Sequence, residues 1–152
     1  EIISNADSII VEVDMDKEII KKVVSLAKQY NKKLYGVVSN MSIAVERRDF
    51  LKHFDCFICN QLEAGMLFME DYSQKSPEEL RDILAKRVTL GKIPSMIVTM
   101  GGNGAVYADM NGDKGICPPQ QVMRSAQALR VDLLTERRLA NLSRLEAALP
   151  LP

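Results

Sequence analysis

The chain has 152 residues, of which 47% are hydrophobic and 26% charged, so it is long enough for one globular domain and unlike a disordered protein. Twenty basic residues balance twenty acidic ones, which argues against a nucleic-acid-binding protein and against binding to a membrane surface. The apolar runs are too short for a membrane span, and no signal peptide is visible.

Apolar strand-like runs alternate with helical patterns along the first part of the chain. The β-branched run at 8–13 predicts a buried strand. A helix is predicted over 16–30, with Asp14 or Asp16 as its cap. The next predicted elements are a strand at 33–40, a short helical stretch at 43–54, a strand at 55–60 and a helix at 61–69.

The signals continue through residue 117. Ser76, Pro77 and Glu79 form the pattern of an N-cap, a first helical position and a capping box, and Gly91 is expected to end that helix. The remaining predicted elements are a strand at 95–100 and a hairpin at 104–117 that turns at Asn111-Gly112.

Strands that alternate with helices predict an α/β fold with a mostly parallel sheet and helices on both faces. Such sheets bind ligands beyond the carboxyl ends of their strands, so each strand end is a candidate binding position.

Three cysteines, Cys56, Cys59 and Cys117, are typical of reduced thiols in a cytoplasmic protein. The pair in "CFIC" admits a redox or zinc interpretation, but no second Cys/His pair completes a zinc site. Two residues three apart on a strand face opposite sides, so buried structural cysteines are expected. His53, between Lys52 and Phe54, is expected to be a helix-surface residue and not a catalyst.

Three strand ends carry candidate binding residues. Asn40 follows a strand and, alone, indicates a turn. Asn60 and Glu63 fit either a helix cap or a carboxylate that organises a divalent cation and phosphate at a helix N-terminus. After Thr99 come three glycines, Gly101, Gly102 and Gly104, which form either a plain connection or a backbone that a ligand approaches closely.

The order of these motifs resembles the ribokinase-like carbohydrate kinases of the PfkB superfamily. "NQLE" at 60–63 is similar to the family's Asn-x-x-Glu motif, and "TMGGNG" at 99–104 to its Thr-x-Gly-x-x-Gly strand end. "LYGVVSNMSIAVERRDF" and "HFDCFICNQLEAGMLF" are similar to the pseudouridine kinase branch. The resemblance covers about 1–120 and implies an incomplete ribokinase-like, Rossmann-type fold with flanking helices.

The resemblance also implies site residues and cofactors. In the family the Asn-x-x-Glu carboxylate organises Mg²⁺ and phosphate, which implies this role for Glu63 with Asn60. The Thr-x-Gly segment lies along ATP, which implies cofactor contacts for Thr99 and Gly101 and for the following Gly104. Asn40 would lie near the nucleotide. The implied partner is a small-molecule sugar or nucleoside.

The chain departs from the family after residue 120. No Gly-Ala-Gly-Asp segment follows the hairpin, and 121–152 contain no glycine, lysine or isoleucine. No catalytic residue is therefore assigned. Two hypotheses remain: part of an ATP-dependent kinase whose complete parent phosphorylates a sugar hydroxyl, or a non-catalytic α/β fragment with residual nucleotide binding or none.

Residues 121–152 form a Leu/Arg/Ala-rich tail distinct from the kinase-like part at 1–120. Leu139, Leu142, Leu145 and Leu149 recur near one face, which predicts a helix that docks on the core or on a second copy of the chain. The tail is expected to come from a frameshift, fusion or truncation, or to be a divergent C-terminal helix. The family's N-terminal portion is also expected to be missing.

Overall fold

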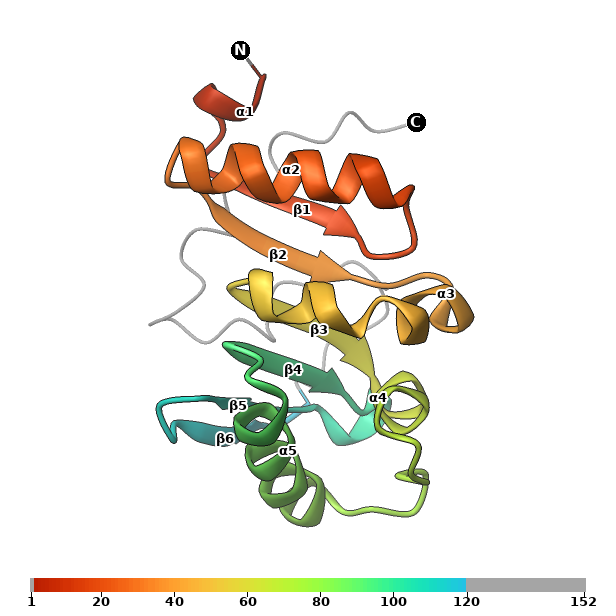
Figure 1. The fold of residues 1–152 in the computed structure, drawn as a ribbon. Helices are drawn as coiled ribbons and strands as arrows, with labels where there is room; N and C mark the ends of the chain where they lie inside the picture. The colour runs from red at the N-terminus through yellow and green to blue at the C-terminus, as the bar shows by residue number, and fades with distance from the viewer. Residues whose placement is uncertain (1, 120–152) are drawn as a thin grey trace.

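Six strands form one sheet in chain order (Figure 1). The computed structural model describes residues 2–119. Strands β1 to β4 are parallel, whereas β4 with β5 and β5 with β6 pair antiparallel. The strands are β1 (Ser8–Glu12), β2 (Lys33–Val37), β3 (Cys56–Asn60), β4 (Ser95–Thr99), β5 (Ala105–Asp109) and β6 (Lys114–Cys117). The predicted mostly parallel α/β sheet is confirmed.

Helices connect the parallel strands. The α-helices are α1 (Ile2–Asn5), α2 (Lys17–Gln29), α3 (Met41–Glu46), α4 (Gln61–Phe68) and α5 (Pro77–Gly91), and the 3₁₀ helices are η1 (Arg48–His53) and η2 (Gly101–Asn103). Asp16 caps α2, and Ser76 with Glu79 forms the predicted capping box of α5. Within residues 2–119, no helix combines the length and apolar character needed to cross a bilayer.

The connecting helices pack on one face of the sheet, which corrects the prediction of helices on both faces for the part of the chain that the structure describes (Figure 1). Buried side chains of α2, α3, η1, α4 and α5 all join one cluster with Val11, Phe57 and Val98 of the strands. The second buried cluster, on the opposite face, contains strand residues alone: Tyr35, Cys56, Ile97, Ala105 and Cys117. Right-handed crossovers that always advance in one direction place every helix on the same side.

The cysteine prediction is confirmed. Cys56 belongs to the strand-only cluster and Cys59 to the helix-covered one, so the two thiols face opposite sides of β3. All three cysteines are buried. Burial, followed by the nearby Glu63 carboxylate, raises the pKa of the Cys59 thiol well above its ordinary value, which disfavours the reactive thiolate.

One helical stretch differs from the sequence prediction, and one helix end agrees with it. The stretch expected to be helical at 43–54 is the short helix α3 followed by the 3₁₀ helix η1. Gly91 is the last residue of α5, as predicted, and the following residue, Lys92, adopts the left-handed conformation. The Lys92 backbone N–H donates to the carbonyls of Val88 and Thr89, so local hydrogen bonds hold this conformation.

The hairpin turn involves Asp109 as well as the predicted Asn111 and Gly112. One Asp109 carboxylate oxygen accepts from the backbone N–H groups of Asn111 and Asp113, both at 2.9 Å. Gly112 supplies the positive φ of 89° that the turn requires. The tail predicted as a helix at 121–152, and its proposed role in a homo-oligomer, lie outside the described residues and stay predictions.

Candidate functional site

The strand ends singled out in the sequence lie along one edge of the sheet. Asn60 at the end of β3 pairs in register with Thr99 at the end of β4. Thr99 pairs in turn with Ala105, which pairs with Cys117, so β5 and β6 also meet this carboxyl-terminal edge. Asn40 follows β2, the other neighbour of β3. The fold therefore brings the predicted nucleotide-contacting segments to adjacent strand ends.

Asn60 and Glu63 form a capping box at the start of α4. The Asn60 side-chain oxygen accepts from the Glu63 backbone N–H at 2.9 Å, and the Glu63 carboxylate accepts from the Asn60 backbone N–H at 2.7 Å. The helix-cap interpretation is thus confirmed. The capping box engages Oε2 of Glu63, and the Mg²⁺ role of this carboxylate stays a prediction.

Asn40 also acts as a cap, at the start of α3. Its side-chain oxygen accepts from the Ser42 backbone N–H at 3.2 Å. The adjacent Ser39 hydroxyl donates to the Glu12 carboxylate at 3.0 Å, which links the ends of β2 and β1. Asn40 is exposed, and its cofactor contact remains a prediction.

The two positive-φ glycines of the segment after β4 have different surroundings. Gly101 has a φ of 56°, and a Cβ built there would meet nothing within 4 Å, so its backbone is open to a ligand. Gly104 has a φ of 83°, and a Cβ there would lie 2.1 Å from the Cys117 carbonyl oxygen. Packing against β6 therefore explains why residue 104 is a glycine, and no ligand is needed for that explanation. Gly101, in contrast, has the accessibility that a nucleotide contact needs.

Two further polar residues, Arg47 and Asp14, lie near this edge. Arg47 follows α3 and donates through Nη1 to the Val13 carbonyl at 3.1 Å and to the Met15 carbonyl, so it ties α3 to the end of β1. Asp14 has a buried Oδ1 with no hydrogen-bond partner within residues 2–119. The sequence suggested Asp14 only as an alternative cap, and Asp16 is the cap in the structure.

The described residues contain no group of three or more His, Cys, Asp or Glu side chains that could hold a metal ion. Glu63 remains the single predicted metal ligand of this edge. Its position at the amino end of α4 suits a negative charge, and anionic ligands also bind at such positions.

Solved structures similar to this chain agree on its fold. No family model matches the chain. Over 107 residues it is 27% identical to a guanosine-inosine kinase of Exiguobacterium acetylicum, covering 70% of this chain and 34% of the relative. A PfkB protein of Polaromonas sp. JS666 matches 99% of this chain and 50% of its own, with a TM-score of 0.63 and 13% identity. Adenosine kinase of Sinorhizobium meliloti matches 88% of this chain and 41% of its own, with a TM-score of 0.60 and 18% identity.

The chain therefore spans about a third of its curated relative and half or less of these solved structures. None of these three proteins is a pseudouridine kinase, so the branch suggested by the sequence gains no support from them. Residues 2–119 form a part of the ribokinase-like fold of the PfkB carbohydrate kinases.

Proposed function

We propose that this chain is part of an ATP-dependent nucleoside or sugar kinase and supplies its nucleotide-contacting edge. The observation that carries the proposal is the in-register pairing of Asn60 and Thr99, which places the Asn-x-x-Glu and Thr-x-Gly segments side by side. In this arrangement the open Gly101 backbone would contact ATP, and Glu63 would hold Mg²⁺, which would neutralise phosphate charge.

The substrate class is a nucleoside, which the complete protein phosphorylates on a sugar hydroxyl. The similarity to a guanosine-inosine kinase supports a purine nucleoside as the substrate, whereas the residues in and around the motifs support pseudouridine. Both share the ribose that carries the reacting hydroxyl, so the chemistry proposed is phosphoryl transfer from ATP to ribose, with Mg²⁺ neutralising the developing charge.

Nucleotide binding is tested by calorimetry with ATP and Mg²⁺. Replacing Gly101 by Val should weaken binding at least about tenfold, because a side chain would block the close approach of the ligand to the backbone. Gly112→Val is the matched control: this glycine also has a positive φ and open space, but it lies in the β5–β6 turn at the opposite edge. Equal affinity in wild type and Gly101→Val would show that the assigned contact is wrong.

The second candidate is a non-catalytic α/β fragment. It is favoured by the capping box, which gives Asn60 and Glu63 a structural role without any ligand. Incubation of the chain with ATP, Mg²⁺ and guanosine, inosine or pseudouridine discriminates the two. We expect no phosphorylation by this chain alone, since loss of general-base catalysis by itself costs about 10²–10⁴-fold. Magnesium-dependent phosphorylation that Glu63→Gln abolishes would contradict this expectation.

A further inference from the structure

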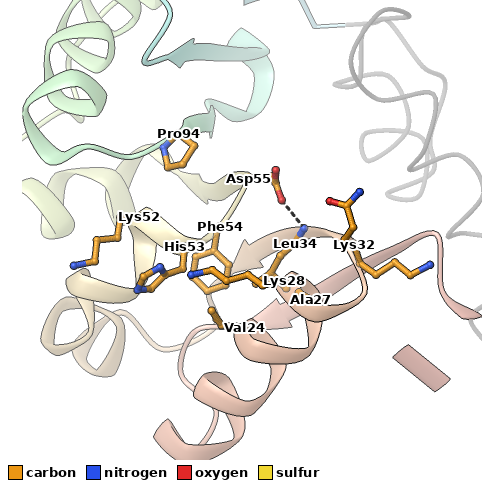
Figure 2. A pocket seen from close by; sticks show the side chains of 11 residues that line it. Val24, Ala27, Lys28, Lys32, Leu34, Lys52, His53, Phe54, Asp55 and Pro94 are labelled. Atoms are coloured by element: carbon orange, nitrogen blue, oxygen red, sulfur yellow. Dashed lines mark hydrogen bonds between the residues drawn. The ribbon is translucent and has the colours of Figure 1, made fainter. Parts of the chain in front are cut away.

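We propose that a cavity at the amino-terminal edge of the sheet binds a phosphate group between Lys28, Lys52 and His53. The cavity has a volume of about 320 Å³, within the range of small-molecule sites. It lies opposite to the edge discussed above, because Leu34 and Asp55 at the starts of β2 and β3 line it (Figure 2).

Two elements, α2 and η1, carry the Lys28, Lys52 and His53 side chains that line the cavity. Lys28 comes from the last turn of α2, and Lys52 and His53 end the 3₁₀ helix η1, which immediately precedes β3. In Figure 2 the Lys28 side chain extends toward the imidazole of His53, whereas Lys32 extends away on the other side. Val24, Ala27 and Phe54 add an apolar lining to the cavity.

The Asp55 carboxylate, which lines the cavity, already has hydrogen-bond partners. Asp55 accepts from the Lys33 ammonium at 2.7 Å and from the Leu34 backbone N–H at 2.8 Å. Within residues 2–119, Lys28 and Lys52 take part in no ion pair. Their charges therefore remain available to an external anion.

The pKa of His53 reflects its burial and the excess of positive charge at the cavity. Burial lowers the pKa of His53, and the positive charges of Lys28 and then Lys52 lower it further, against a smaller opposing effect of Asp49. An anion bound between these groups would favour the imidazolium and raise this pKa. The carboxyl end of α2 also favours a lysine such as Lys28, but this effect does not explain why the Lys28 side chain extends toward His53.

The experiment follows the NMR titration of His53, the single histidine of the chain, with and without inorganic phosphate at constant ionic strength. We expect millimolar phosphate to raise the His53 titration midpoint by about 0.5–1 pH unit in a saturable manner. Lys28→Gln and Lys52→Gln should each reduce this rise. Lys22→Gln, which removes an exposed charge elsewhere on α2, should leave it unchanged.

The same variants provide an internal check without phosphate. Lys28→Gln and Lys52→Gln should raise the His53 midpoint by removing repulsion, whereas Lys22→Gln should not. The proposal is overturned if chloride at equal ionic strength produces the same rise as phosphate, or if Lys22→Gln reduces the response as much as the two cavity variants do.

Discussion

The two edges of the sheet use their polar residues differently. At the carboxyl-terminal edge, the side chains of Asn40, Asn60 and Glu63 bind backbone groups and start helices. At the amino-terminal edge, Lys28 and Lys52 are among the residues that line a cavity and, within the described part of the chain, they pair with no carboxylate. A ligand site can therefore be indicated in two independent ways: by residues that match a family motif, or by charged side chains that no opposite charge neutralises.

Gly104→Ala should cause the largest loss, because it combines a positive φ of 83° with a Cβ placed 2.1 Å from the Cys117 carbonyl oxygen. Backbone strain and overpacking together should lower the free energy of unfolding by about 3–5 kcal/mol. Gly101→Ala is the matched control with open space around it and should lose only about 1–2 kcal/mol. Urea unfolding measures both, and equal losses would show that contact with β6 does not distinguish the two glycines.

Arg47→Met should cause the next largest loss of stability. It removes the hydrogen bonds from the guanidinium to the carbonyls of Val13 and Met15, which join α3 to the end of β1. A hydrogen bond from a charged donor contributes about 1.5–3 kcal/mol, so a loss in that range is expected in the free energy of unfolding. Arg48→Met, at the neighbouring position, is the control. A loss for Arg47→Met no larger than the control's would exclude this link as a stabilising feature of the carboxyl-terminal edge.

Asn60→Ala should lower the free energy of unfolding by about 1 kcal/mol, because it removes the side-chain half of the capping box. Glu63→Gln should cost less, since the amide oxygen can still accept from the Asn60 backbone N–H. If Glu63 also organises Mg²⁺, this substitution should abolish any rise in melting temperature produced by ATP with Mg²⁺. An unchanged rise would leave Glu63 with its capping role alone.

Asp55→Asn at the amino-terminal edge should have the smallest effect, below about 1 kcal/mol, because its pair with Lys33 is largely exposed. The hydrogen bond and charge of Asp55 raise the pKa of Lys33 above its ordinary value of 10.5. This stabilisation is complete below 10.5 and is lost as the pH rises through the higher folded-state pKa. Wild type should therefore lose more stability than Asp55→Asn between neutral and strongly alkaline pH. Parallel curves from urea unfolding across that range would refute the pair's contribution.

The amino-acid sequence by itself determined the features that depend on neighbouring residues. The capping boxes at Asn60 and Ser76 join groups three residues apart, so their residue types predict them directly. The strands were predicted because β-branched and apolar runs suit buried parallel strands. The opposite facing of Cys56 and Cys59 likewise follows from the two-residue period of a strand.

Only the tertiary structure decided the features that depend on distant segments. The single helix-covered face follows from the strand order, which local patterns do not encode. Gly104 is required because β6 returns over it, and the sequence could not separate this reason from a ligand contact at Gly101. Lys28 and His53 lie 25 positions apart in the sequence. Their charges interact because α2 and η1 line the same cavity, and no local pattern predicts that proximity.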